Sequence, residues 1–392
     1  TIPYVGARGG LVIVSAGDPS CRTSPNEQDQ RYLASMLGIP TLDPKTPGEA
    51  HRMARFAFQL SEQCRLPVLL RPTTRVCHSR APVNFGPLKW PEVGGFVRDP
   101  RGMVPIPVNA RPMRLDQERR VALAARLLDE TDFVRSSGGS AALGIIAAGA
   151  PAATCGDLLQ EYELAHQVPL LSVGVVYPLP EQKIAAFLQG KERVLLVEEL
   201  SPYLEDLVLA LCARHRLTVE VLGKHSGHLP VPFEYEPAIL RRALHGALGL
   251  GEAPAPRAPP PEVPVRPPVL CSSCPHRTSY FVARSVFGPE RLFFNDIGCY
   301  TLGYGQPLDS ADALLCMGAG ITLAAGVSRV TGERTVGFLG DSTFFHSGMP
   351  ALVNAIKEDV SLVVVVLDNQ VTAMTGFQQS PSVEVAGGKP VR

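Results

Sequence analysis

A proline-rich segment near residue 260 divides this chain into two parts. Residues 251–268 read GEAPAPRAPPPEVPVRPP and include eight prolines. Proline has no backbone N–H and fixes φ, so this segment cannot join the interior of a sheet. We expect an extended tether between folded parts, with a ligand for a proline-recognition domain as the alternative interpretation.

Strand-length apolar runs alternate with an amphipathic segment before this tether. Residues 10–16 (GLVIVSA) and 67–74 (PVLLRPTT) are typical of buried parallel strands, and residues 49–64 of an amphipathic helix between them. The polar stretch 17–31 follows the first strand, at the place where open α/β sheets bind ligands. It is therefore a candidate wall of a site, with a plain solvated connection as the alternative.

The alternation of strands and helices becomes regular after residue 140. We expect strands, separated by helices, at 142–149, 168–180, 193–200 and 217–223. This order predicts a mostly parallel sheet with right-handed crossovers. No titratable residues of this block are expected to gather around a pocket, and Glu198 and Glu199 are interpreted as acids at the start of a helix.

Composition excludes several classes of protein. Lys and Arg total 37, as do Asp and Glu, so no global field attracts nucleic acid or an anionic membrane. No apolar run reaches the length of about 18 residues that a membrane span needs. Nine cysteines with one tight pair are unlike a secreted disulfide framework. We expect a cytoplasmic enzyme with no membrane or nucleic-acid partner, and, because the chain starts at Thr1 without methionine, part of a longer protein.

Two β-branched runs after the tether end in polar residues. Residues 334–340 (RTVGFLG) and 360–368 (VSLVVVVLD) have strand length, and the residues between them suit one crossover helix. As parallel neighbours, these strands would bring Asp341 and Asn369 within reach of one Mg²⁺, which a diphosphate would share. The start of the crossover helix would offer N–H groups to that phosphate. The alternative is that both residues cap helix starts.

These and other motifs together resemble a known family. GDS (340–342) followed by DNQ (368–370) resembles the diphosphate motif of thiamine-dependent enzymes, except that Ser342 stands where glycine is usual. The chain resembles the large subunit of indolepyruvate ferredoxin oxidoreductase over essentially its whole length. The motifs that carry this resemblance are CSSCPHR, DIGCYTLG, FFHSGMPALVNAI, DNQVTAMTGFQ and GGLVIVSAGDPSCRTSPNEQDQRY.

The resemblance implies an α/β fold of several doubly wound, mostly parallel-sheet domains of thiamine diphosphate-binding type. Residues 1–90 would be the C-terminal part of a pyrimidine-binding domain, and residues 91–250 a transketolase C-terminal-like α/β domain. Residues 251–268 would be the linker, and 269–392 a diphosphate-binding domain that is incomplete at its C-terminus. The glutamate that activates the pyrimidine is expected upstream of Thr1, and a ferredoxin-like tail beyond Arg392 or absent.

The resemblance also implies an activity. Family members oxidatively decarboxylate aryl-pyruvates to aryl-acetyl-CoA and pass electrons to ferredoxin, together with a smaller β subunit in a hetero-oligomer. The thiamine diphosphate-binding subunit would be the catalytic one. Two alternatives stay open: a non-redox thiamine-dependent decarboxylase or synthase, and a non-catalytic regulatory subunit of the same fold.

Particular residues follow from the resemblance. Mg²⁺ would be held by Asp341, Asn369 and the main-chain carbonyl of Val371. Met317 is the candidate apolar wedge under the bent cofactor, with a methionine that fills an ordinary core gap as the alternative. Gly318 and Gly320 would allow close backbone approach. The other expected cofactor contacts are Gly340, Ser342, Thr343, Gly318, Cys299 and Thr372.

Residues expected to act on the substrate are fewer. By resemblance, Asn26 and Gln28, with Ser24, face the active site from the polar stretch 17–31. His346 follows the metal aspartate closely and would touch the diphosphate or the substrate. Its alternative role is a purely structural helix cap.

A second set of candidate ligands consists of cysteines. Cys271 and Cys274 form a C-x-x-C pair, and Cys299 follows at a distance. Such thiolates can hold a [4Fe–4S] cluster, whose fourth ligand would be Cys316 or a residue beyond the end of the chain. A zinc site completed by His276 and a set of unligated thiols are the alternatives.

Overall fold

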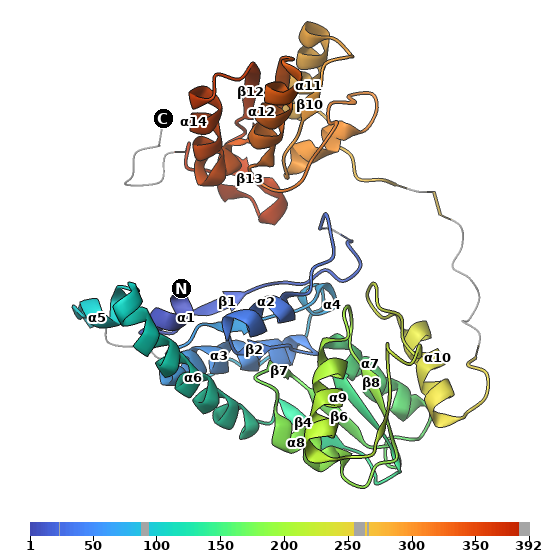
Figure 1. Cartoon of the computed structure of the whole chain (residues 1–392). Helices are drawn as coiled ribbons and strands as arrows, with labels where there is room; N and C mark the ends of the chain where they lie inside the picture. The colour runs from blue at the N-terminus through green and yellow to red at the C-terminus, as the bar shows by residue number, and fades with distance from the viewer. Residues whose placement is uncertain (23, 88–93, 255–262, 265, 384–392) are drawn as a thin grey trace. The chain divides into compact units, whose positions relative to one another are not determined.

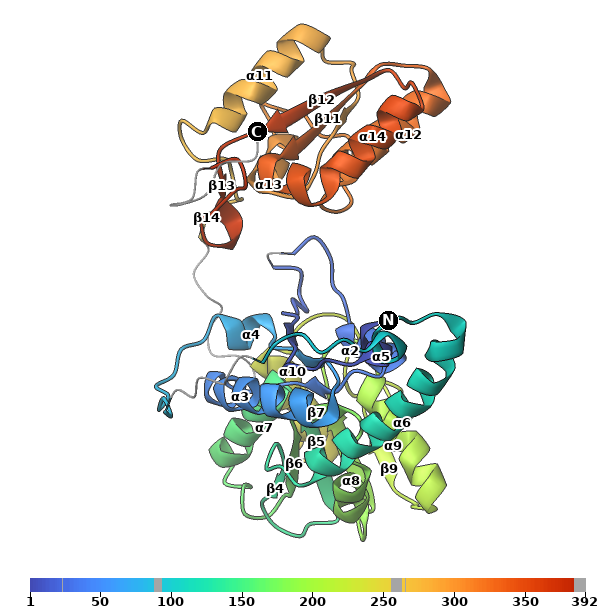
Figure 2. The same ribbon diagram turned by 90° about the vertical axis from the view of Figure 1, so that its left-hand side faces the viewer.

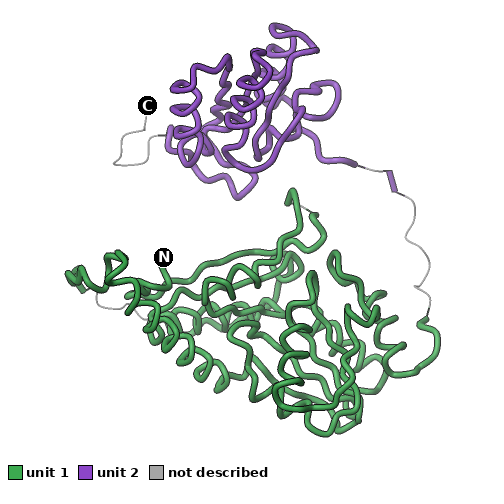
Figure 3. The backbone as a smooth tube through the Cα atoms, in the orientation of Figure 1, with its two compact units in different colours: residues 1–259 green, residues 260–392 purple. Residues whose placement is uncertain are grey.

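The chain forms two compact α/β units. The computed structural model describes residues 1–22, 24–87, 94–254, 263–264 and 266–383. One unit comprises Thr1–Pro259 and the other Pro260–Arg392 (Figure 3). The predicted α/β class is confirmed, whereas much of the predicted tether lies outside the described residues. No helix in the described ranges combines the length and apolar character of a bilayer span.

The first sheet of the N-terminal unit has the strand order β1-β3-β2-β7 (Figure 1). β1, β3 and β2 are parallel, and β7 runs antiparallel to β2. Its strands are β1 (Val12–Val14), β2 (Thr41–Leu42), β3 (Val68–Leu70) and β7 (Val175–Tyr177). The strands predicted within 10–16 and 67–74 are thereby confirmed as parallel neighbours.

Six helices accompany this sheet: α1 (Ile2–Val5), α2 (Gln30–Leu37), α3 (Pro47–Cys64), α4 (Thr74–Cys77), α5 (Pro100–Met103) and α6 (Pro107–Asp129). The predicted helix is α3. It begins where it does because the hydroxyl of Thr46 accepts the Glu49 N–H (3.2 Å), while the Glu49 carboxylate accepts the Lys45 N–H (2.8 Å). α2 and β2 are additional elements in a region expected to be a connection.

The second sheet has five strands in the order β4-β6-β5-β8-β9. All neighbours are parallel except β4, which runs antiparallel to β6. The strands are β4 (Val134–Ser137), β5 (Leu143–Ala148), β6 (Leu170–Val173), β8 (Arg193–Val197) and β9 (Glu220–Leu222). The accompanying helices are α7 (Ala150–Glu161), α8 (Glu181–Leu188), α9 (Tyr203–His215) and α10 (Pro237–Leu248).

The segment predicted as one strand over 168–180 is two strands in different sheets. β6 belongs to the second sheet and β7 to the first, with Gly174 between them. Gly174 donates its N–H to the Phe133 carbonyl and accepts the Asp43 N–H, both at 2.9 Å. A Cβ at Gly174 would lie 2.5 Å from the Met53 methyl carbon, which can move, and 2.9 Å from the Phe133 carbonyl oxygen, which belongs to the backbone, so this crossing favours glycine.

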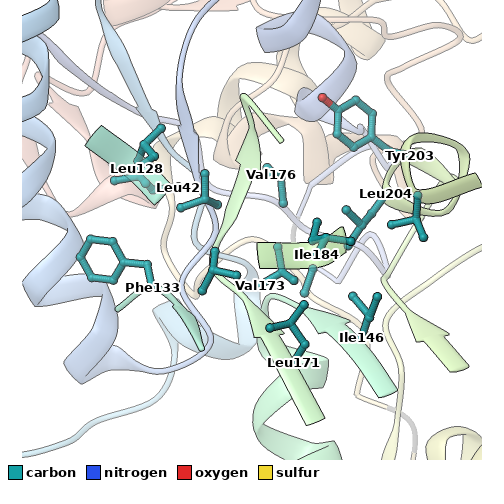
Figure 4. Close-up of a cluster of buried hydrophobic side chains, with 14 of the residues drawn as sticks. Leu42, Leu128, Phe133, Ile146, Leu171, Val173, Val176, Ile184, Tyr203 and Leu204 are labelled. Atoms are coloured by element: carbon teal, nitrogen blue, oxygen red, sulfur yellow. The ribbon is translucent and has the colours of Figure 1, made fainter. Parts of the chain in front are cut away.

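The continuous segment formed by β6, Gly174 and β7 joins the two sheets around one hydrophobic core. Leu42 from the first sheet packs in the same buried cluster as Ile146 and Leu171 from the second, together with Phe133 (Figure 4). Residues before and after position 90 therefore share a core. The assignment of these stretches to a pyrimidine-binding and a transketolase C-terminal-like domain stays a prediction.

Buried charges also connect the two sheets. The Arg31 guanidinium is 1% exposed and donates to Glu198 (2.5 Å) and Asp29 (2.6 Å). Glu198 accepts the Leu204 and Glu205 N–H groups at 2.8 Å, which confirms it as an acid at the start of α9. Sequence spacing does not reveal this cluster, because Arg31 and Glu198 are 167 residues apart along the chain.

The neighbouring Glu199 makes the stability of this unit depend on pH. Burial raises the pKa of Glu199 to about 7, although the Tyr235 N–H and Arg71 lower it. Between about pH 4.5 and about 7 the folded chain holds the proton that the unfolded chain releases, so stability falls by about 3 kcal/mol as pH rises. We predict that Glu199→Gln removes this slope and stabilises the protein above pH 7.

Urea unfolding at about pH 5 and about pH 8 measures this effect. Glu192→Gln, at an exposed carboxylate just before β8, is the matched control and should keep the wild-type slope. An unchanged slope in Glu199→Gln would contradict the assignment.

The C-terminal unit is built on a parallel sheet with the order β10-β11-β12. Its strands are β10 (Phe293–Phe294), β11 (Thr335–Gly340) and β12 (Leu362–Leu367), and β13 (Val371–Thr372) pairs separately with β14 (Gln378–Gln379). The α-helices are α11 (Pro275–Phe287), α12 (Ala319–Thr331), α13 (Asp341–Thr343) and α14 (Met349–Lys357). The shorter helical turns are η1 (Cys299–Tyr304), η2 (Phe344–Gly348) and η3 (Ala373–Thr375).

Side chains of β11 alternate between two apolar layers. Val336 and Phe338 pack with Tyr280 of α11, whereas Leu339 packs with Ile321 of α12 and Ala355 of α14 (Figure 2). This alternation explains why residues 336–340 carry no polar side chain, as in a sheet covered on both faces. The predicted strand pair of 334–340 and 360–368 is confirmed as parallel.

α12 approaches β11 so closely that one of its positions requires glycine. A Cβ at Gly320 would lie 2.3 Å from the Phe338 carbonyl oxygen. We predict that Gly320→Ala destabilises the unit by about 1–3 kcal/mol, because the helix must move away from the strand. Gly326→Ala on the same helix, where no atom lies within 4 Å of the new Cβ, should instead stabilise it by about 0.5–1 kcal/mol.

Thermal and denaturant unfolding of the two variants measure this difference. Equal stabilities would show that the approach of α12 to β11 is not a close one.

Candidate active site

Asp341 and Asn369 leave the sheet at the same edge, as predicted. Gly340 of β11 lies opposite Leu367 of β12, so the residues that follow each strand emerge side by side. Asp341 and Asn369 line one pocket of about 50 Å³ together with Val371. The predicted Mg²⁺ ligands are therefore gathered at the carboxyl ends of two parallel strands, where α/β sheets place their ligands.

Asp341 has one oxygen without a partner. Its side chain is 4% exposed, and Oδ1 accepts the Ser342 N–H at 2.8 Å. Within the described residues, buried Oδ2 has no hydrogen-bond partner. Burial raises the pKa of Asp341, and the adjacent Asp368 carboxyl raises it further, whereas the Ser342 N–H and nearby Ser380 lower it. A divalent cation would supply the missing partner and offset the charge repulsion, so the donor set fits Mg²⁺.

The alternative interpretation of two helix caps describes Asp341 only in part and does not describe Asn369. Asp341 is the first residue of α13, and its Oδ1 accepts the Ser342 N–H of that helix at 2.8 Å. Asn369 precedes a strand rather than a helix, and its Oδ1 accepts the Val371 N–H at 3.3 Å. This long bond fixes the turn and leaves the Asn369 oxygen with a free lone pair.

The crossover helix begins directly at the pocket. Ser342 and Thr343 of α13 line the pocket, and the helix continues through the π-helical turn η2 into α14. Pro350 lacks the N–H that a regular helix would use, and a π turn absorbs such a defect. The pattern of apolar residues predicts the helix but not its π turn.

His346 lies in this π turn. Its side chain is exposed, and it is not among the residues that line the pocket. Burial raises the pKa of Asp296, and a positive charge on His346 opposes this, so His346 lies near the loop that carries Asp296. Its role toward diphosphate or substrate stays a prediction.

Asp296 connects the motifs DIGC and MGAG. It is fully buried, and its carboxylate accepts the Ile297 and Gly318 N–H groups, both at 2.7 Å. Gly318 starts α12 with φ of +95°, a conformation that favours glycine. Met317 and Cys299 are thereby held at the pocket wall, where Met317 is 42% exposed. A partly exposed methionine here fits the proposed wedge better than a core filler.

His276 and Tyr300 are among the pocket residues that the motifs did not predict as contacts. His276 is 4% exposed, and burial lowers its pKa although the charge of Asp341 raises it. Burial raises the pKa of Tyr300 to about 12, and its hydroxyl donates to the Ile297 carbonyl at 3.0 Å. A Cβ at Gly340 would lie 2.7 Å from the Tyr300 ring, which explains the glycine before Asp341. His276 lies in the motif CSSCPHR and Tyr300 in DIGCYTLG, so membership of these motifs was the one sequence signal for their place at the pocket.

The predicted cofactor contact Thr372 lines the pocket from β13.

The predicted cysteine ligands are less well gathered. In the part of the chain that the structure describes, no three His, Cys, Asp or Glu side chains form a metal-binding group. Cys271, Cys274 and Cys299 are free thiols. Burial raises the pKa of Cys299, and the charges of Cys274 and Cys271 raise it further, so the three lie in one neighbourhood.

The candidate substrate residues of 17–31 belong to the N-terminal unit. Ser24 donates its hydroxyl to the Asn26 carbonyl at 3.0 Å, and the Gln28 amide donates to Asn26 Oδ1 at 3.2 Å. These bonds give the tip of the loop a defined shape. That Asn26 and Gln28 face the active site stays a prediction.

Removing the charge of Asp341 tests the cation site. We predict that Mg²⁺ with thiamine diphosphate raises the melting temperature of the wild type but not of Asp341→Asn, because binding stabilises by about 2.7 kcal/mol at a hundredfold excess over Kd. Without ligands, Asp341→Asn should be at least as stable as the wild type, since a buried charge without a partner is removed. Asp309→Asn, at a carboxylate that is 60% exposed, is the control and should respond as the wild type does.

Comparison with known proteins is consistent with this geometry. Residues 296–390 match the family described as thiamine pyrophosphate enzyme, C-terminal TPP binding domain. The indolepyruvate oxidoreductase subunit IorA of Methanothermobacter marburgensis is 42% identical over 99% of this chain and 64% of its own length. IorA of Archaeoglobus fulgidus is 34% identical, again over 99% of this chain and 64% of its own length. The chain thus spans slightly less than two thirds of these curated relatives.

Among solved structures, a 2-oxoglutarate:ferredoxin oxidoreductase from Magnetococcus marinus aligns with a TM-score of 0.43 and 14% identity, over 63% of this chain and 50% of that chain. Similarity at this level carries no conclusion. The family match and the IorA relatives support two statements: residues 296–390 are similar to thiamine pyrophosphate-binding C-terminal domains, and the resemblance of the chain to indolepyruvate oxidoreductase subunits is confirmed.

Proposed function

We propose that this chain is the thiamine diphosphate-binding part of a 2-oxoacid:ferredoxin oxidoreductase. The reaction is the oxidative decarboxylation of aryl-pyruvates to aryl-acetyl-CoA, with electrons passed to ferredoxin and a smaller β subunit as partner. The observation that carries the proposal is Asp341, a buried carboxylate beside Asn369 at two parallel strand ends, with one oxygen that has no hydrogen-bond partner among the described residues. The names of the IorA relatives support indolepyruvate as the substrate type.

Different residues of the pocket would contact different parts of the cofactor. Asp341, Asn369 and the Val371 carbonyl would hold Mg²⁺, and Ser342 and Thr343 at the start of the crossover helix would border the diphosphate. Gly340 and Gly318 would allow close approach, Thr372 and Cys299 would border the cofactor, and Met317 would support its bend. When bound, thiamine diphosphate supplies the centre that stabilises negative charge as the 2-oxoacid loses carbon dioxide.

Asp341 and Asp368 would drive cation binding. The neighbouring Asp368 carboxyl adds to the burial that raises the pKa of Asp341, and a cation held between Asp341 and the diphosphate would remove the cost of ionising Asp341. His276, whose pKa burial lowers, stays neutral beside them and adds no competing positive charge. On the substrate side, Asn26, Gln28 and His346 are the proposed contacts.

The route of the electrons is proposed from cysteine spacing. Cys271, Cys274 and Cys299 would supply three ligands of a [4Fe–4S] cluster, with a fourth from elsewhere in the whole protein. Their common neighbourhood supports this assignment. A cluster close to thiamine would accept electrons as the substrate is oxidised.

Activity of the full-length chain with its smaller subunit tests the function. We predict ferredoxin reduction that depends on indolepyruvate, coenzyme A and thiamine diphosphate, with Asp341→Asn reducing kcat/KM at least about a hundredfold, or about 2.7 kcal/mol of transition-state stabilisation. Electron paramagnetic resonance of the anaerobic protein should show a cluster signal. Carbon dioxide release without a cluster or electron transfer would identify a non-redox decarboxylase instead. Absence of thiamine diphosphate binding would leave the regulatory alternative.

A further inference from the structure

The loop between β1 and α2 is attached firmly at both ends. At its start, Gly17 pairs with Thr73 after β3, and the Thr74 hydroxyl donates to the Gly17 carbonyl at 3.1 Å. At its end, Arg31 is fixed by buried ion pairs, and the Gln30 side chain accepts from Arg71 at 3.1 Å. The loop can be followed in blue in Figure 1.

A third attachment holds the middle of the loop against residues 230–236. The Glu234 carboxylate is 8% exposed and accepts from Arg22 of the loop (3.0 Å) and from Arg75 of α4 (2.7 Å). The Glu234 N–H donates to the Ser20 hydroxyl at 2.9 Å. The Phe233 N–H donates to the Glu27 carboxylate at 3.0 Å.

This contact is more than an ordinary surface ion pair. In the pair of Arg52 and Asp132, both side chains are more than half exposed, which makes such pairs worth little. Glu234 is instead nearly buried and bridges two arginines from different segments. Phe233 has φ of +73°, an unfavourable conformation for its side chain, which the surrounding contacts must maintain.

We infer that Glu234 is a positioning residue that fixes the loop carrying Asn26 and Gln28. This inference rests on the proposed function, in which those two residues contact the substrate. The tip of the loop has internal bonds and one bond to Phe233, so its place depends on the segments on either side of it and on residues 230–236, which Glu234 holds against the loop. A shift of a substrate contact by about 1 Å is enough to weaken binding or turnover strongly.

Hydrogen exchange of the full-length protein tests the clamp itself. We expect Glu234→Gln to increase amide exchange over residues 18–28 about tenfold, since the charge that holds Arg22 and Arg75 is lost. Glu236→Gln is the matched control, because Glu236 is 65% exposed and reaches Arg22 only at 3.7 Å. Arg22→Gln, at a side chain that is 51% exposed, removes one of the two ion pairs of Glu234 without risk to folding. It should increase amide exchange over residues 18–28 by less than Glu234→Gln does. Unchanged exchange in both Glu234→Gln and Arg22→Gln would overturn the clamp.

Steady-state kinetics with the smaller subunit test the positioning role. Glu234→Gln should raise KM for indolepyruvate about fivefold or more, while Kd for thiamine diphosphate stays within about twofold of the wild type. Glu234→Asp, which keeps the charge, should recover part of the KM. Faster exchange with an unchanged KM would overturn the positioning role and leave a structural clamp. A wild type that binds no thiamine diphosphate would overturn the proposed function, and exchange would still decide the clamp.

Discussion

A carboxylate buried at the end of a strand is costly unless something neutralises or binds it. Asp341 is such a group, with one oxygen bonded to the next N–H and the other without a partner in the described residues. The elements around Asp341 are arranged so that a ligand could bind this carboxylate. β11 and β12 bring Asn369 to the same pocket, the crossover helix starts there, and Asp296 fixes the opposite wall. Thiamine diphosphate with Mg²⁺, the proposed occupant, would give this arrangement its chemical purpose.

Contacts between its two sheets hold the N-terminal unit together. β6 and β7 continue one another through Gly174, which places a single chain segment in both sheets and forms one core. Arg31 adds a buried charge contact between the start of α2 and the end of β8. These contacts make the loop after β1 part of a rigid frame. Such a frame suits a loop that would carry substrate contacts, because binding groups need fixed positions.

Local sequence patterns predict the parts of this structure that depend on neighbouring residues. The runs 334–340 and 360–368 predict adjacent parallel strands, and so they predict the convergence of Asp341 and Asn369. The division of 168–180 between two sheets depends on distant partners, Met53 and Phe133, that no local pattern reveals. His276 and Tyr300 reach the pocket through the packing of α11 and η1. Motif spacing therefore predicts the adjacent residues Cys274 and Cys299 as ligands but does not predict His276 and Tyr300 as pocket residues. Cysteine spacing suggests a cluster without determining its fourth ligand.

A crystal structure of the full-length protein with thiamine diphosphate and Mn²⁺ in place of Mg²⁺ is the most direct measurement. Anomalous scattering locates the ion independently of any assumed ligand. We predict one ion at about 2.0–2.3 Å from the Asp341 carboxylate, Asn369 Oδ1 and the Val371 carbonyl, with diphosphate oxygens completing its coordination. A cofactor bound elsewhere, with the Asp341 carboxylate still lacking a partner, would contradict the account.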